Sequence, residues 1–170
     1  GWSVAGVGDV NDDGVDDLAI GATGDDDGGS GAGAVYVLYG PLANGNVSLA
    51  NANLKITGEV ENDSAGWNVA GIGDVNDDGI DDIAIGAIGD DAGGSGAGAV
   101  YVLYGPLSNG NMSLSKADLK LIGTSVNDHV GRSVAKAGDI NNDGVDDLAI
   151  GVTGYGDVGP GEGAVYVLYG

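Results

Sequence analysis

The sequence predicts an all-β protein made of β-propeller blades, each with four short antiparallel strands. Three observations support this prediction. Near-identical segments recur every 65 residues, beginning at Asp9, Asp74 and Asp139. Each of the first two periods contains four short strand patterns, the third contains three, and none contains a helical pattern. Turn-forming Gly, Asp and Ser residues separate the patterns, which is typical of the four-stranded blades of a propeller.

In the first period, strands are expected over residues 3–7, 17–22, 34–39 and 53–57. Residues 17–22 place apolar side chains two apart on one face, and residues 34–39 are rich in β-branched and aromatic side chains. Residues 53–57 alternate between polar and apolar, which predicts an exposed outer strand. Residues 48–54 (SLANANL) could form a helical turn, but their Asn content favours a loop.

The period divides the chain into three predicted blades. Residues 1–65 form the first, residues 66–130 the second, and residues 131–170 a third that lacks its last strand. Since propellers close with about four to eight blades, we expect an incomplete ring of about three blades. Either a longer array or further copies of the chain would complete such a ring.

Composition excludes several functional classes. The 170 residues carry a net charge of -21 and only five Lys and Arg, which argues against nucleic-acid binding. Without cysteine there are no disulfides and no thiolate metal sites. No run of about 18 apolar residues is present, so a membrane-spanning segment is not expected. The 42% of hydrophobic residues are enough for a folded core.

Each period also contains the pattern D-x-N-x-D-G-x-x-D, which predicts a calcium loop. Oxygen-bearing side chains at positions 1, 3 and 5 can turn inward around one ion, and Gly at position 6 permits the sharp turn. The backbone carbonyl at position 7 and Asp at position 9 would complete the shell. Such oxygen ligands suit Ca²⁺ and offer nothing to a soft metal. The expected ligands are Asp9, Asn11, Asp13, Val15 and Asp17, then Asp74, Asn76, Asp78, Ile80 and Asp82, then Asp139, Asn141, Asp143, Val145 and Asp147.

An EF-hand is excluded because its loop requires Glu at position 12, where this chain has Ile20, Ile85 and Ile150. The remaining acids of the loops are expected to face solvent without binding the ion; they are Asp12, Asp16, Asp77, Asp81 and Asp146. The Asp runs at residues 25–27 and 90–91 are likewise expected to be solvated loops.

These motifs resemble the FG-GAP repeats of the integrin alpha-subunit β-propeller and its bacterial relatives. The matching phrases are GWSVAGVGDVNDDGVDDLAIGA, GWNVAGIGDVNDDGIDDIAIGA and GRSVAKAGDINNDGVDDLAIGV, each followed by GAVYVLYG. The resemblance implies a propeller in which a calcium loop joins the first two strands of each blade, with about three Ca²⁺ held by the fifteen residues above. The family's Phe-Gly and Gly-Ala-Pro phrases are altered here, which leaves the partner undefined.

No catalytic set is expected. The single histidine, His129, replaces Ser64 of the preceding period, so it does not belong to the repeating design and is interpreted as a loop residue. Trp2 and Trp67 occupy equivalent positions, with Arg132 in the third period. Packing between blades is the favoured interpretation, and a carbohydrate or protein contact is the alternative.

The function expected from the sequence is a non-catalytic, calcium-binding structural or adhesion module, located outside the cell or on its surface. Its partner would be a protein or carbohydrate of the cell surface or matrix. Two alternatives stay open: a repeating subunit of a homopolymeric filament or layer, and a non-catalytic interaction domain of a larger secreted hydrolase. Open strand edges favour the former, because an unpaired edge invites strand addition.

Overall fold

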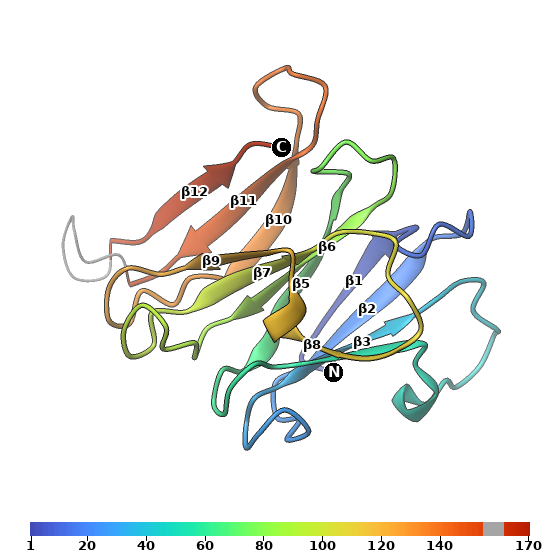
Figure 1. The fold of residues 1–170 in the computed structure, drawn as a ribbon, viewed down its shortest axis with the longest axis horizontal. Helices are drawn as coiled ribbons and strands as arrows, with labels where there is room; N and C mark the ends of the chain where they lie inside the picture. Colours follow the sequence, from blue (N-terminus) through green and yellow to red (C-terminus); the bar gives the residue numbers. More distant parts are fainter. Residues whose placement is uncertain (155–161) are drawn as a thin grey trace.

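The computed structural model describes residues 1–154 and 162–170 of the chain. In these residues the first sheet has the order β1-β2-β3-β4-β8 (Figure 1). Its strands are β1 (Ser3–Gly8), β2 (Asp17–Ala22), β3 (Ala34–Leu38), β4 (Leu54–Thr57) and β8 (Gly110–Ser113). The first four are antiparallel neighbours, whereas β8 comes from the second repeat and pairs with β4 in parallel.

The second and third sheets repeat the antiparallel order. The second is β5 (Ala65–Gly73), β6 (Asp82–Ala87), β7 (Ala99–Leu103) and β9 (Leu119–Ile122). The third is β10 (Ser133–Gly138), β11 (Asp147–Val152) and β12 (Ala164–Leu168). Two short 3₁₀ turns, η1 (Leu49–Asn51) and η2 (Leu114–Lys116), lie in the connections before β4 and β9.

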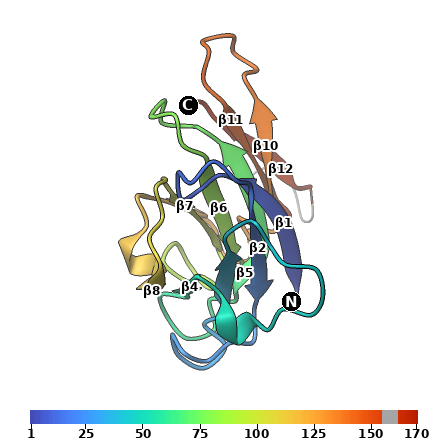
Figure 2. The ribbon, with the colours of Figure 1, turned by 90° about the vertical axis from the view of Figure 1, so that its right-hand side faces the viewer.

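The sheets follow one another like successive blades. The first strands of the three sheets lie closest together, with β5 in contact with both β1 and β10. Seen from the side, the third sheet stands at one end of the molecule (Figure 2). No ring closes among the described strands. The prediction of all-β blades in an incomplete ring is therefore confirmed.

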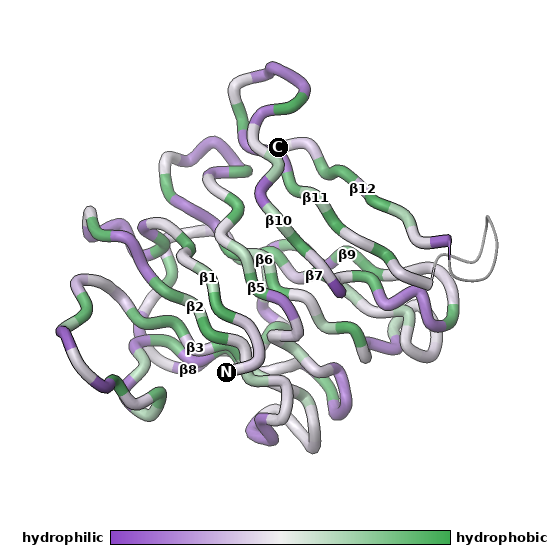
Figure 3. Tube along the Cα trace, turned by 180° about the vertical axis from the view of Figure 1, so that it is seen from behind, coloured by the Kyte–Doolittle hydropathy of each residue, from purple (hydrophilic) through white to green (hydrophobic). Residues whose placement is uncertain are grey.

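Two hydrophobic clusters hold the blades together. The first joins the first two sheets and includes Val35, Ile56, Ile83 and Tyr101. The second joins the second and third sheets around residues such as Ile150. Because the middle sheet packs on both faces, every residue of β6 and β7 is buried, whereas β2 alternates. The apolar residues follow these strands in Figure 3.

Two predictions about the first repeat are wrong. Residues 48–54 are not a plain loop, because Leu49–Asn51 forms η1, in which the Ser48 side chain accepts the N–H of Ala50. The strand expected at residues 53–57 is present as β4, but it is neither exposed nor outermost. Leu54 and Ile56 are buried, and β8 covers the free edge of β4. Strand β8 was not predicted from the sequence.

Candidate metal centres

The three D-x-N-x-D-G-x-x-D segments form hairpin loops of one design. Each connects the first two strands of its sheet, β1 to β2, β5 to β6 and β10 to β11, and the three loops follow one another down the upper right side of the molecule in Figure 1. Each hairpin has a register shift at its end, between Gly6 and Gly8 in the first case. The repeat therefore places three equivalent candidate sites on one side of the molecule.

The Asp at position 1 organises the turn by accepting two backbone N–H groups. In the first loop, Asp9 Oδ1 accepts from Asp13 at 3.0 Å and Oδ2 accepts from Gly14 at 2.7 Å. Asp74 and Asp139 make the same pair of bonds in their own loops. Desolvation would raise the pKa of Asp9, but the N–H groups of Gly14 and Asp13 hold it below its ordinary value of 3.8. This carboxylate is therefore ionised at neutral pH.

The side chains at positions 3 and 5 are held together. Asn11 Nδ2 donates to Asp13 Oδ2 at 2.9 Å, and Asp13 Oδ1 accepts from the N–H of Val15 at position 7. The second and third loops have the same contacts. Since the Asn amide group donates to the acid, its carbonyl oxygen is left facing the loop.

The hydrogen bonding of the Asn carbonyl oxygen at position 3 differs between the loops. In the second and third loops, Asn76 Oδ1 and Asn141 Oδ1 accept the N–H of position 5 at 3.3 and 3.0 Å. In the first loop, Asn11 Oδ1 is buried and has no hydrogen-bond partner among the described residues. A buried oxygen without a donor costs free energy unless a cation or water satisfies it. This oxygen is therefore the clearest local signal for a ligand.

The Asp at position 9 ties the loop to the rest of the blade. Asp17 Oδ2 accepts from the N–H of Val10, and Oδ1 accepts from that of Gly40, just after β3. Asp82 and Asp147 bond in the same way to the residues that follow β7 and β12. Burial raises the pKa of Asp17, and it raises that of Asp82 to about 6.

The donor set fits a hard cation, although three acid side chains do not gather at one point in any described loop. Positions 1 and 5 supply carboxylates, position 3 an amide oxygen and position 7 a backbone carbonyl. Each carboxylate oxygen that accepts one N–H has further lone-pair capacity, so the bonds of position 9 do not remove it as a ligand. The fifteen predicted ligands thus stay a prediction, with positions 1, 3 and 5 brought together by the structure.

Two of the acids expected to face solvent do more than that. Asp81 Oδ2 accepts the N–H of Asp9 in the preceding loop, and Asp146 pairs with Lys136. Both are half-buried. Asp12, Asp16 and Asp77 are exposed, as predicted.

One Asp of each Asp run belongs to a second type of polar cluster, which was not predicted from the sequence. Asp25 Oδ2 accepts from the Tyr36 hydroxyl at 2.6 Å and from Lys55 Nζ at 2.8 Å. One repeat later, the buried Asp90 contacts the Tyr101 hydroxyl at 2.7 Å and Lys120 Nζ at 2.8 Å. The expectation of solvated loops is therefore wrong for both Asp25 and Asp90.

The cluster around Asp90 also links two repeats. Glu59, which precedes the second sheet, accepts from both the Tyr101 hydroxyl and Lys120 Nζ. Burial would raise the pKa of Asp90, but the bonds from Lys120 and Tyr101 hold it below 3.8. A signal for this cluster was present in the sequence, because two of the few lysines recur one period apart in strands that face Asp-rich loops.

The two tryptophans, Arg132 and His129 lie in packing contacts or in turns. The rings of Trp2 and Trp67 lie 4.8 Å apart at a tilt of 42°, and the Arg132 guanidinium lies 5.7 Å from the Trp67 ring. This contact between successive repeats supports the packing interpretation. His129 has a φ of 51° and Ser64 has one of 56°, so the two residues occupy equivalent left-handed positions in successive repeats.

Comparison with known proteins identifies the repeats. A family model described as "FG-GAP repeat" matches residues 1–38, 65–103 and 130–168, and each match contains one of the three loops. The chain is 33% identical over 150 residues to integrin alpha-11 of Mus musculus and 30% identical over 155 residues to integrin alpha-11 of Homo sapiens. Each alignment covers 86% of this chain but only 12% of the integrin. In the described residues, no helix is long and apolar enough to span a membrane.

Proposed function

The chain belongs to the FG-GAP repeat family, and on that premise we propose that it is a calcium-stabilised, extracellular interaction module. One Ca²⁺ per repeat would bind in the loop between the first two strands of each sheet. The module itself would carry out no catalysis, and its partner would be a protein of the cell surface or matrix.

The observation that carries this proposal is the buried, unpartnered Oδ1 of Asn11 beside two carboxylates. Asp9 and Asp13 are oriented around the same turn by backbone N–H groups. Among the described residues, neither carboxylate forms a salt bridge with Lys or Arg, so the loop presents negative oxygens that are not neutralised. A hard divalent cation satisfies such a group of oxygens, and Ca²⁺ accepts six to eight of them at flexible geometry.

When bound, the ion would supply positive charge that offsets repulsion among the loop carboxylates. In each loop, the residues at positions 1, 3, 5, 7 and 9 would hold it. Because position 9 also accepts the N–H of the second residue after the third strand, binding would stabilise three strands of the sheet together. In extracellular modules, calcium typically binds with a dissociation constant of about 10⁻⁴ to 10⁻³ M, which suits a structural role outside cells.

Thermal unfolding in calcium and in excess chelator, at matched ionic strength, tests this function. Each site saturated at 100 times its dissociation constant should add about 2.7 kcal/mol to the free energy of unfolding if the ion binds only the folded state. A large rise in melting temperature is expected. An unchanged melting temperature would show that the loops are ordinary turns.

Two matched variants separate specific binding from general screening of the acidic chain. Asp13→Ala removes a predicted ligand, whereas Asp16→Ala removes an exposed carboxylate of the same loop. Calorimetric titration should find one site fewer in the first variant and the full number in the second. Equal stoichiometry in both variants would contradict the ligand assignment.

A further inference from the structure

The second repeat holds the backbone of the first candidate loop at two points. Asp81, at position 8 of the second loop, accepts the N–H of Asp9 at 3.0 Å. Leu107, in the connection that follows β7, donates its N–H to the carbonyl of Val10 at 2.7 Å. The Tyr39 hydroxyl of the first repeat donates in turn to the Leu107 carbonyl at 2.7 Å. Positions 1 and 2 of the first loop are therefore fixed by the repeat that follows it in the sequence.

These contacts act on predicted ligands of the first loop. Asp9 is the ligand at position 1, and its carboxylate accepts the N–H groups of Asp13 and Gly14. The N–H of Val10 donates at 3.1 Å to Oδ2 of Asp17, the ligand at position 9. A displaced backbone at Asp9 or Val10 would therefore move the first and the last ligand of the loop. Removing a group that orients metal ligands in this way typically lowers metal affinity about 10- to 100-fold.

Asp81 is also part of the second loop. It directly precedes Asp82, the predicted ligand at position 9 of that loop, and it is half-buried. The oxygens of Asp82 accept the N–H groups of Val75 and Gly105, so this end of the second loop is tied to its own sheet. One side chain thus belongs to the second loop and holds the first residue of the first loop. Whatever orders Asp82 also orders the adjoining carboxylate of Asp81.

The charges of the second loop determine the sign of the effect. Asp81 shares this loop with four further carboxylates, those of Asp74, Asp77, Asp78 and Asp82. In the calcium-free loop these like charges repel one another and loosen the position of the Asp81 side chain. A cation in the second loop would offset that repulsion. The carboxylate of Asp81 would in turn lie between two bound cations and reduce their mutual repulsion.

We propose that Asp81 positions the first loop for calcium and couples the first two loops, so that an ion in either loop raises the affinity of the other. This coupling rests on the proposed function, because it exists only if the loops bind the ion. Coupling between two sites is reciprocal, and it typically changes affinity about 5- to 150-fold. The first two repeats are thereby expected to bind calcium and to become stabilised together.

The junction between the second and third loops is built differently. Asp146, at position 8 of the third loop, approaches the second loop, since a β-carbon on Gly73 would lie 2.1 Å from its Oδ2 atom. The carboxylate of Asp146 forms an ion pair with Lys136, where the two earlier repeats have glycine. The ammonium group neutralises this carboxylate and places a positive charge beside the second loop, which opposes a cation there. The third loop is therefore coupled more weakly to the second than the second is to the first.

A calcium titration followed by NMR at constant ionic strength tests the proposal. The amide signals of Gly14 and Gly79 are the reporters, because each N–H donates at 2.7 Å to the carboxylate at position 1 of its own loop. Each signal therefore gives the affinity of one loop. In the wild-type chain both signals should shift as calcium is added, and the affinity at each glycine is the reference for the variants.

Three variants test the positioning role of Asp81. Asp81→Ala should weaken calcium binding at Gly14 by about tenfold or more. Asp81→Asn keeps an oxygen that can accept the N–H of Asp9 and should recover most of this affinity. The charge control Asp77→Asn removes an exposed carboxylate from the same loop and should change the affinity at Gly14 by less than about twofold. Equal losses in Asp81→Ala and Asp77→Asn would overturn the proposal, because the lost charge alone would then explain them.

A double-mutant cycle measures the coupling between the loops. Asp78→Ala removes a predicted ligand of the second loop, so binding at Gly14 should weaken by about fivefold or more. In a chain that already carries Asp81→Ala, the same change should have no further effect at Gly14. An affinity at Gly14 that stays the same in Asp78→Ala would overturn the proposal, and this measurement stands even if Asp81→Ala does not fold. Losses that simply add in the double variant would overturn it as well.

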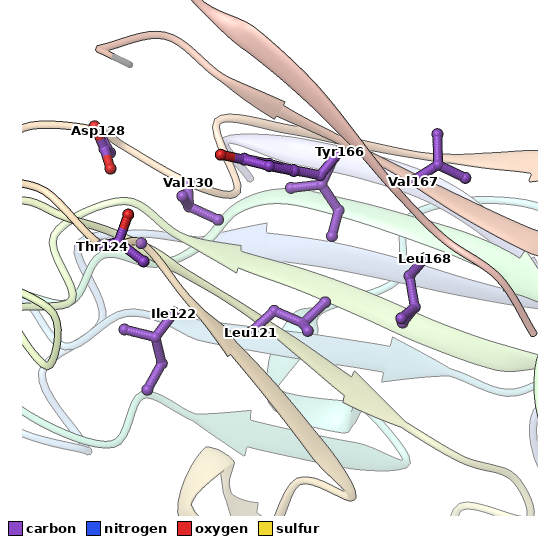
Figure 4. Close-up of a pocket in the computed structure, with 10 residues that line it drawn as sticks. Leu121, Ile122, Thr124, Asp128, Val130, Tyr166, Val167 and Leu168 are labelled. Carbon is purple, nitrogen blue, oxygen red and sulfur yellow. The ribbon is translucent and has the colours of Figure 1, made fainter. Parts of the chain in front are cut away.

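Lys136→Ala tests the difference between the two junctions. It frees the carboxylate of Asp146 and removes a positive charge, so the affinity at Gly79 should rise. The groove of about 310 Å³ between β9 and β12 (Figure 4) has no described lining residue in any of the three loops, and neither Lys136 nor Asp81 lines it. These variants therefore leave the groove unchanged. An unchanged or lower affinity at Gly79 would overturn the role assigned to Lys136.

The same titrations separate this coupling from the proposed function. A wild-type chain in which neither Gly14 nor Gly79 responds to calcium would defeat the proposed function and the coupling with it. Binding at both glycines, with an affinity at Gly14 that depends on neither Asp81 nor Asp78, would defeat the coupling alone and leave the proposed function intact.

Discussion

The Oδ2 atom of Asp81 accepts a hydrogen bond of 3.0 Å from the backbone N–H of Asp9, although the two residues belong to successive loops. The side chain at position 8 of one loop thus steadies the first residue of the loop before it. Gly8 makes room for this contact, since a β-carbon there would lie 2.0 Å from Asp81 Oδ2. Neighbouring candidate sites are therefore physically connected.

Gly8→Ala should destabilise the chain more than Gly14→Ala does. Both glycines have positive φ, 72° and 86°, so each substitution carries the left-handed cost of about 1 to 2 kcal/mol. Only Gly8 meets a neighbour, because no atom lies within 4 Å of a β-carbon on Gly14. Displacing Asp81 should add about 1 to 3 kcal/mol. Denaturant unfolding in chelator measures the difference, and equal losses would show that Asp81 moves aside without cost.

Asp82→Ala should destabilise the calcium-free chain, whereas Asp78→Ala should have a smaller effect. Asp82 is buried and accepts the N–H groups of Val75 and Gly105, both of which would lose their partner. Each buried donor left unsatisfied costs about 1 to 3 kcal/mol. The Asp78 side chain accepts from Asn76 Nδ2 and from the N–H of Ile80, and water can replace these exposed bonds. Unfolding in chelator isolates this structural role from any ligand role, and similar losses in both variants would contradict it.

Asp63→Asn should stabilise the chain at pH 7.5 and lose this advantage near pH 4. Burial raises the pKa of Asp63 to about 6 from its ordinary value of 3.8, and Asp90 and Glu59 add to the effect. At a pH between 3.8 and about 6, Asp63 is therefore protonated in the folded chain and has lost its proton in the unfolded chain. The stabilisation from that proton is complete below about pH 4 and is lost as the pH rises through about 6.

Melting temperatures of the variant and the wild type from pH 4 to pH 8 give this difference directly. Asparagine retains an oxygen that can accept the N–H of Val60, so the fold is preserved. Glu61→Gln removes one exposed charge from the same segment and controls for relief of the overall negative charge. A shift of the same size in both variants at every pH would refute the role of burial.

Tyr39→Phe should weaken the connection between the first two repeats. The Tyr39 hydroxyl donates to the carbonyl of Leu107 at 2.7 Å in a buried contact. Its removal leaves that oxygen unsatisfied and should cost about 1 to 3 kcal/mol. Tyr104→Phe is the matched control, because the hydroxyl of this equivalent tyrosine has no hydrogen-bond partner among the described residues. Equal unfolding free energies for the two variants would contradict the assignment.

The repeats and most of their strands could be predicted from the sequence. The period of 65 residues, the β-branched runs and the intervening turns led to the observed first three strands of each sheet, because these patterns act locally. Positions 1, 3 and 5 of each candidate site followed from spacing alone. The addition of Glu59 to the pair of Asp90 and Lys120 did not, since Glu59 belongs to the first repeat and meets them only when two repeats pack.

The sequence by itself determined the repeating unit, its acidic hairpin loops and the first three strands of each sheet. The tertiary structure alone decided which connections become strands. Residues 45–48 and 110–113 differ by Val in place of Met, yet only the later segment forms a strand, because it lies against the open edge of β4. A strand needs the backbone donors and acceptors of a neighbour, and no local pattern states whether a neighbour is present.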